Sequence, residues 1–117
     1  MMQENLQSPY KKYDKVVTAD EIVIGDLLRI HHRQEDINPE LRLYASYLEV
    51  WSVELGVNTY IPTDFIDEYE PAAGTIHLSA TMRTVQEETW DRAPAFIAGR
   101  KSHREELPAP ADRSLLS

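Results

Sequence analysis

Residues 60–96, YIPTDFIDEYEPAAGTIHLSATMRTVQEETWDRAPAF, contain the clearest succession of structural signals in the chain. Pro62 has no amide hydrogen and a fixed φ, so it suits the end of a strand and the start of a single helical turn over residues 63–65. Residues 71–74 have turn composition and end in Gly74, which is free to adopt positive φ. Over residues 75–79, Ile76 and Leu78 alternate with polar residues, as in a half-buried strand. The stretch therefore predicts short strands joined by tight turns.

A short helical run follows these strands. Ser79 or Thr81 can cap its N-terminus by accepting a hydrogen bond from a free backbone amide. Pro94 prevents the helix from continuing. Trp90, close to Pro94 and Phe96, is interpreted as a plug at the open end of a small β-barrel rather than as a ligand platform.

Further strands are predicted upstream. Residues 15–18 form a short edge strand and residues 21–32 the first long strand, in which Gly25 marks a bulge or sharp bend. From Tyr47, aromatic and β-branched residues favour a central strand, and Gly56 turns the chain into a strand over residues 58–61. Parity within the strands predicts one apolar interior. Its members are Ile24, Leu28, Ile30, Leu48, Val50, Ile61, Phe65, Ile66, Ile76 and Leu78.

Several short patterns occur in a telling order: Val16-Val17-Thr18-Ala19-Asp20, Ile24-Gly25-Asp26-Leu27-Leu28, Tyr47-Leu48-Glu49-Val50, Tyr60-Ile61-Pro62, Phe65-Ile66, Ile76-His77-Leu78-Ser79, and the run 85–94 with Trp90. Over roughly residues 14–97, this order resembles the PRC-barrel family, named for the C-terminal domain of the photosynthetic reaction-centre H subunit. The family's opening turn usually carries Asp-Gly, where this chain has Asp20-Glu21. The resemblance implies an all-β fold, a small PRC-type β-barrel of about five or six strands with one short C-terminal helix.

The 117 residues are enough for one domain. The expected organisation is a flexible arm over residues 1–14, a PRC-barrel-like domain over residues 15–99 and a flexible tail over residues 100–117. No apolar run approaches the ~18 residues of a transmembrane helix, and no signal-peptide pattern is present. The chain has no cysteine, which excludes disulfides and fits a cytoplasmic protein.

Composition limits the partners and the chemistry. The formal net charge of −8 disfavours direct binding to nucleic acid, whose phosphates are neutralised by Lys and Arg. The sequence shows no Gly-rich phosphate loop and no nucleophile elbow. We therefore expect no catalytic residues, no cofactor and a protein that is not an enzyme.

The histidines are the candidates for a polar site. His31 and His32 are adjacent on a predicted strand, so their side chains leave opposite faces and do not share one metal ion. His77 is placed to join His31 across the sheet as a candidate polar site. Hydrogen-bonded strand histidines are the preferred interpretation, because a zinc site needs three or four ligands. No metal site is expected.

An apolar stripe is expected on the outside of the central strand. If Leu48 fills the interior, Tyr47, Trp51 and Val53 lie outside, beside Tyr44. These four residues form the candidate interface of a homodimer, unless the N-terminal arm or the C-terminal tail covers them.

Three functions are left open. The preferred one is a non-catalytic, self-associating interaction or assembly module. The family also includes a domain of a ribosome maturation factor, which implies the alternative of a ribosome-associated assembly factor. The third is a small ligand-binding or enzymatic barrel that uses His31, His77 and the nearby carboxylates, although a small-molecule ligand is not expected. A convergent polar pocket would favour the third function, and a flat apolar patch would favour the first.

Overall fold

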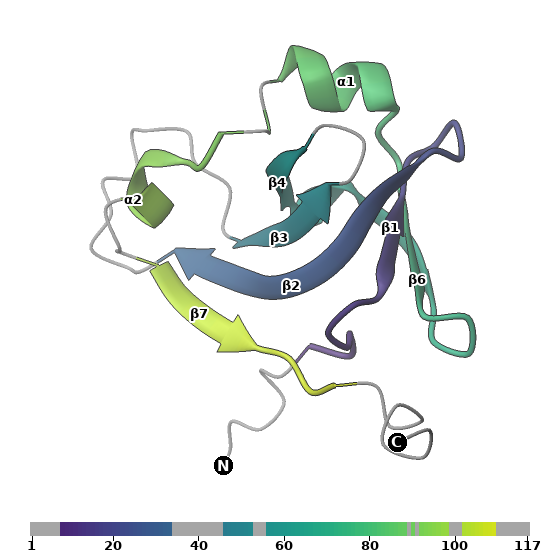
Figure 1. Cartoon of the computed structure of the whole chain (residues 1–117), viewed down its shortest axis with the longest axis horizontal. Coiled ribbons are helices and arrows are strands. Elements are labelled where there is room, and N and C mark those ends of the chain that lie inside the picture. Colours follow the sequence, from purple (N-terminus) through teal and green to yellow (C-terminus); the bar gives the residue numbers. More distant parts are fainter. Residues whose placement is uncertain are drawn as a thin grey trace.

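A computed structural model of the chain describes residues 8–33, 46–52, 56–88, 90, 92–98 and 102–109. These residues are mostly β-structure: seven strands in a single sheet, two short helices and one 3-10 turn, η3 (Figure 1). The strands are β1 (Lys15–Val17), β2 (Val23–Arg33), β3 (Ser46–Ser52), β4 (Val57–Pro62), β5 (Ile66–Glu70), β6 (Thr75–Leu78) and β7 (Ser102–Glu106). The helices are α1 (Met82–Glu87) and α2 (Ala95–Ala98), and η3 spans Thr63–Phe65. An all-β class was predicted and is found, with one strand and one helix more than expected.

The long strand β2 organises the sheet. Six strands follow the order β4-β3-β2-β1-β6-β5, and only the β1–β6 pair is parallel. The seventh, β7, pairs with residues 29–33 of β2, while β1 pairs with residues 23–26 of the same strand. The predicted edge strand β1 is therefore an interior strand, flanked by β2 and β6.

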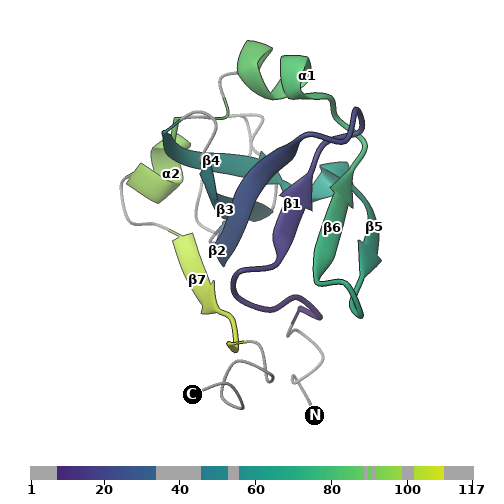
Figure 2. The ribbon, with the colours of Figure 1, turned by 45° about the vertical axis from the view of Figure 1, so that its right-hand side comes forward.

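The sheet curls strongly. β4 and β5 stand at opposite ends of the strand order, yet η3 alone joins them in the chain. Three residues span at most roughly 10 Å, so the two ends of the sheet must approach each other. Figure 2 shows β3 and β4 crossing behind β2 while β1, β6 and β5 lie side by side. Within the described residues β4 and β5 do not pair, so the sheet is open where a closed barrel was predicted.

The predicted core is largely confirmed. Seven of its ten members are at most 2% exposed: Ile24, Ile30, Leu48, Val50, Ile61, Ile76 and Leu78. Phe65 and Ile66 are partly buried and pack against this cluster. Trp90 is also buried, with its ring centroid 4.9 Å from that of Phe65.

Leu28 was assigned to the core and this is wrong. The pairing of β2 with β3 shifts between Leu27 and Arg29, so Leu28 is an extra residue, a β-bulge. The bulge reverses the alternation of faces: Leu27 is fully buried and Leu28 is only half-buried.

Two backbone positions near the first hairpin explain its shape. An alanine Cβ at Gly25 would lie 1.6 Å from the carbonyl oxygen of Trp51, so only glycine permits this close approach of β2 to β3. The β1–β2 register shifts beside it, between Val16 and Val17, which confirms the predicted bulge. In the turn, Glu21 has φ 66°, so it adopts the left-handed conformation that glycine adopts more readily.

Described residues of the predicted N-terminal arm contact described residues of the predicted C-terminal tail. The backbone amide of Lys12 donates to the carbonyl oxygen of Pro108 at 2.9 Å. Both the amide and the hydroxyl of Ser8 bond to the carboxylate of Glu105, at 2.8 and 3.0 Å. The predicted tail over residues 100–117 includes the strand β7, and residues 1–7 and 110–117 lie outside the described residues. In the described part of the chain, no helix is long and apolar enough to cross a membrane.

Candidate functional site

The face of β2, β3 and β4 that points away from the core carries a row of polar side chains. Leu48 and Val50 fill the core, so Glu49 between them must point to the other face. Its cross-strand partners are Arg29 on β2 and Tyr60 on β4, which therefore lie on the same face. Two residues further along β2, His31 pairs with Tyr47 on that face.

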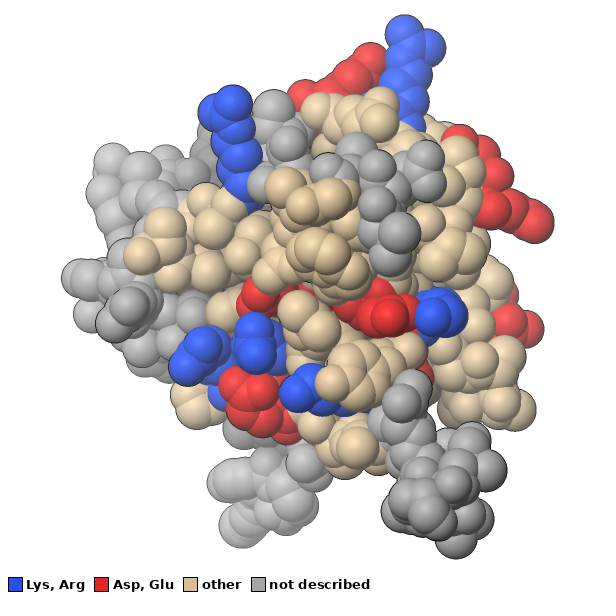
Figure 3. All heavy atoms as spheres, viewed as in Figure 1, with Lys and Arg blue, Asp and Glu red and all other residues tan. Residues whose placement is uncertain are grey.

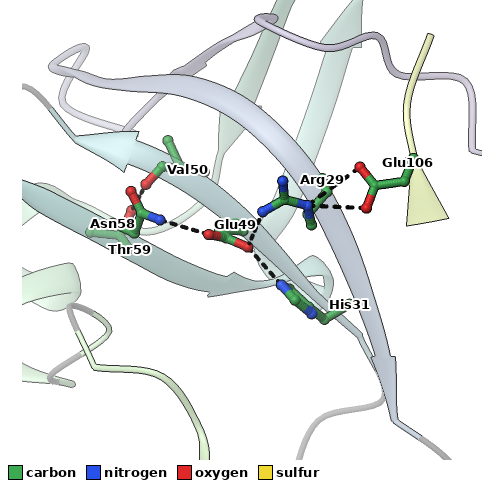
Figure 4. Close-up of polar contacts among 7 residues, drawn as sticks. All are labelled: Arg29, His31, Glu49, Val50, Asn58, Thr59 and Glu106. Atoms are coloured by element: carbon green, nitrogen blue, oxygen red, sulfur yellow. Dashed lines mark hydrogen bonds and ion pairs between the residues drawn. The ribbon is translucent and has the colours of Figure 1, made fainter. Parts of the chain in front are cut away.

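Glu49 is the centre of a hydrogen-bond network (Figure 4). Its Oε1 accepts from Nη1 of Arg29 at 2.9 Å and from Nε2 of His31 at 2.7 Å. Its Oε2 accepts from Nδ2 of Asn58 at 2.6 Å. The Glu49 side chain is only 9% exposed, and both of its oxygens are satisfied. These three donors make it possible to bury a carboxylate in the middle of a strand.

The network keeps Glu49 ionised. Burial alone raises the pKa of a carboxyl group, but the hydrogen bonds from His31 and Arg29 outweigh it and lower the pKa of Glu49 to about 2. An ionised carboxylate only accepts, so Nε2 of His31 carries the proton in this contact.

Arg29 links the network to β7. Its Nε lies 3.3 Å from a carboxylate oxygen of Glu106, whose side chain is 59% exposed. Burial by itself lowers the pKa of Arg29, but the bonds and charges of Glu49 and Glu106 raise it above its ordinary value. The positive charge of Arg29 is therefore matched mainly by the buried Glu49, because the exposed Glu106 is screened by water.

A cavity of about 660 Å³ opens over this face. Arg29, His31, Glu49 and Tyr60 form its floor, and α2 and β7 form its walls through Ile97, Ala98 and Arg104. Figure 3 views the molecule from the side of Figure 1 and shows charges of both signs gathered over the end of β2 and over β7. The cavity is thus a polar pocket with one apolar wall, hereafter the outer pocket.

Two of its side chains stay available to a ligand. Burial first, and the charge of Glu49 second, raise the pKa of Tyr60, so its hydroxyl keeps its proton. The backbone of Arg104 pairs in register with His31, and its exposed guanidinium has no hydrogen-bond or ion-pair partner among the described residues.

The two histidines proposed for a joint site are not brought together. His31 lies in the outer pocket, whereas His77 lines a separate hollow of about 410 Å³ near the first hairpin. Nε2 of His77 lies 2.8 Å from Oε1 of Glu70, and this bond raises the pKa of His77. Among the described residues, no group of three or more His, Cys, Asp or Glu side chains is placed to hold a metal ion.

The candidate interface is only partly where the sequence placed it. Trp51 is 44% exposed, so the prediction that it lies outside the core is confirmed. Tyr47 shares its face but is 6% exposed and therefore not part of an exposed stripe. Its cross-strand partner His31 is 4% exposed and lines the outer pocket together with Ile97 and Ala98 of α2, so this half of the face is buried and offers no exposed apolar stripe. Tyr44 and Val53 lie outside the described residues.

Sequence reasoning missed most of the outer pocket. The strand parity that places Tyr47 and Trp51 outside also places Glu49 there, but no function was attached to Glu49, and Arg29, Tyr60 and Arg104 were not selected. The signal was local: Arg29 and His31 are two residues apart on one strand, and Glu49 interrupts an apolar strand. Their convergence follows from strand register, which the sequence does not state.

The comparisons with known proteins give no further guide, since no family model, no curated protein and no solved structure matches this chain. The geometry of the outer pocket is the basis for a functional assignment.

Proposed function

We propose that this protein is a non-catalytic binding module on a PRC-barrel-like β-fold, and that the outer pocket is its binding site for a small molecule. The single observation behind this is the convergence of Arg29, His31, Glu49, Tyr60 and Arg104 on one cavity. A convergent polar pocket favours the ligand-binding alternative over the assembly module that composition favoured.

The size and lining of the cavity support binding. Small-molecule sites usually have volumes of about 300–1,000 Å³ and combine apolar walls with a few placed polar groups. The outer pocket, at about 660 Å³, falls in that range. Its polar floor is held in place by the Glu49 network, so little ordering is needed when a ligand enters.

The protonation of the floor supports a non-catalytic role. A general base works best when its pKa lies near the working pH, and the pKa of Glu49 is held at about 2. The pKa of Tyr60 is raised, which makes its hydroxyl a poorer acid. Both groups suit recognition by hydrogen bonds better than proton transfer.

The fold supports the PRC-barrel part of the proposal. The described strands form a single sheet, which curls strongly. Its two end strands, β4 and β5, are joined in the chain by the three-residue turn η3 alone. The strand from residue 57, the 63–65 turn, the 75–78 strand and the buried Trp90 all lie within the part of the chain that carries the resemblance.

A fragment screen by NMR tests the proposal. The isotope-labelled chain is titrated with a library that contains anionic, neutral and cationic small molecules. We expect at least one class to shift the backbone amide signals of residues 29–31, 49 and 60 saturably. No saturable shift at these residues from any class would overturn the proposal.

A blocking variant shows where the fragments bind. Ala98 is exposed and lines the pocket from α2, outside the Glu49 network. Ala98→Phe is expected to fill the cavity and abolish the shifts. The matched control, Ala73→Phe, places the same ring on the exposed β5–β6 turn and is expected to bind as the wild type does. Unchanged binding by Ala98→Phe would place the ligand elsewhere.

A further inference from the structure

We infer that the ligand of the outer pocket is a small organic monocarboxylate with an apolar body, whose carboxylate binds the guanidinium of Arg104. This inference rests on the proposed binding function and adds the chemical class of the ligand. It follows from the charge balance, the donors and the shape of the cavity.

The described residues of the lining carry one positive charge in excess. Arg29 and Arg104 each contribute one positive charge, and the ionised Glu49 contributes one negative charge. Arg29 and Glu49 are bound to each other at 2.9 Å, so their charges are matched. Glu106 contacts Arg29 from outside the lining, and its side chain is 59% exposed to screening solvent. The charge of Arg104 is left for a ligand of one negative charge.

The available polar groups are donors. Both oxygens of Glu49 already accept hydrogen bonds from within the protein. Arg104 presents a planar guanidinium, which can form two parallel hydrogen bonds to one carboxylate. Tyr60 retains its hydroxyl proton because its pKa is raised. A cationic ligand would find no free carboxylate oxygen on the described floor, so the lining selects an anion.

The cavity is too large for an inorganic ion alone and has an apolar wall. Its volume is about 660 Å³, and Ile97 and Ala98 line it beside the ring of Tyr60. A ligand that fills it therefore has an apolar body next to its carboxylate. A polyanion such as a nucleic acid is disfavoured, because the whole chain has a net charge of −8.

Benzoate and benzamide test this inference, because they share the ring and differ in charge. The full chain is titrated with each, and the amide shifts of the outer pocket are followed by NMR. We expect saturable binding of benzoate and at least about tenfold weaker binding of benzamide, since a hydrogen bond to a charged group contributes more than a neutral one. Inorganic phosphate and acetate are expected to bind more weakly than benzoate, because neither contacts the apolar wall.

Arg104 variants identify the recognising group. Arg104→Gln is expected to weaken benzoate binding about tenfold or more and to leave benzamide binding unchanged. Arg104→Lys keeps the charge without the planar fork and is expected to bind at an intermediate strength. Arg83→Gln removes an arginine of α1 that is 85% exposed and is not among the lining residues, and this variant is expected to bind as the wild type does.

Three results would overturn the inference. Equal binding of benzoate and benzamide would show that charge is not recognised, while the proposed binding function would stand. Tighter binding of phosphate than of benzoate would exclude the apolar body. Unchanged benzoate binding by Arg104→Gln would assign the carboxylate to another group.

Discussion

Glu49 shows how one side chain can determine the character of a face. It lies between two core residues of β3 and accepts hydrogen bonds from Arg29, His31 and Asn58. A buried carboxylate without these donors would cost several kcal/mol. With these three donors, the buried Glu49 carboxylate holds the side chains of the pocket floor in fixed positions.

This anchoring makes stability depend on pH. The pKa of Glu49 is about 2 in the folded protein, against an ordinary value of 4.5. A lowered pKa contributes stability that is present above about pH 4.5 and is lost as the pH falls towards 2. We expect Glu49→Gln to lose about 1–3 kcal/mol at pH 7 in urea unfolding, and to differ less from the wild type at pH 2.5.

Glu87→Gln is the matched control. The Glu87 side chain is 62% exposed on α1 and pairs only with Arg83 among the described residues. The substitution Glu87→Gln should change the free energy of unfolding by at most about 0.5 kcal/mol at either pH. An equal loss for Glu49→Gln at pH 7 and pH 2.5 would contradict the role given to its charge.

The left-handed backbone conformation of Glu21 can be tested by substitution. Its φ of 66° places a side chain in the left-handed region, at the position where the resembling family has glycine. The left-handed conformation costs about 1–2 kcal/mol for a residue with a Cβ, and a glycine avoids this cost. Part of that stabilisation is offset because glycine makes the unfolded chain more flexible. We expect Glu21→Gly to stabilise the protein by about 0.5–1 kcal/mol in thermal or urea unfolding. Destabilisation would mean that the hairpin turn has another conformation.

At the scale of elements, β2 is informative because it changes face along its length. The bulge at Leu28 lets Leu27 and Ile30 both reach the core, although they are three residues apart on one strand. The same bulge sets Arg29 and His31 on the outer face. Without the bulge, strict alternation after Leu27 would turn Arg29 and His31 towards the core.

A pair of alanine variants tests the bulge. Leu27 is fully buried, so Leu27→Ala should cost about 2–5 kcal/mol. Leu28 is half-buried, so Leu28→Ala should cost less than about 1 kcal/mol. Urea unfolding of both variants measures the difference, and a larger loss at Leu28 would restore the simple alternation that the sequence predicted.

Local elements were predictable because few neighbouring residues determine them. Pro62 ends β4 at the 63–65 turn, Gly74 takes φ 62° before β6, and Thr81 caps α1 by accepting from the amide of Thr84. The bulge at Leu28 and the strand β7 were not predictable, since both depend on pairing with strands that are distant in the sequence.

The pocket escaped prediction for the same reason. Arg29 and Glu49 are 20 residues apart in the chain, and Arg29 and Glu106 are 77 apart. Only the register of β2 with β3 and β7 brings them together.

At the scale of the whole molecule, the outer face changes from covered to open along β3. Tyr47 and Glu49 are 6% and 7% exposed, whereas Trp51 on the same face is 44% exposed. Ser52 pairs with both Gly25 and Val57, so Val23 and Val57 lie at the same end of the sheet as Trp51. They are 50% and 40% exposed. Trp51, Val23 and Val57 are thus exposed apolar side chains near one end of the sheet, hereafter the end patch, although the pairing of Val57 with the buried Ser52 places Val57 on the other face from Trp51.

We predict that the end patch mediates homodimer formation. Single exposed apolar residues are ordinary, but three at the ends of neighbouring strands are characteristic of an interface. In a two-fold dimer, the end patch of one copy would pack against the end patch of the other. Tryptophan is enriched among the residues that contribute most to the binding energy of such interfaces. Light scattering should give the mass of a dimer for the wild type and of a monomer for Trp51→Glu. Tyr13→Glu, which alters a 40% exposed aromatic residue before β1, should remain dimeric. A monomeric wild type, or a dimer indifferent to Trp51→Glu, would exclude this interface.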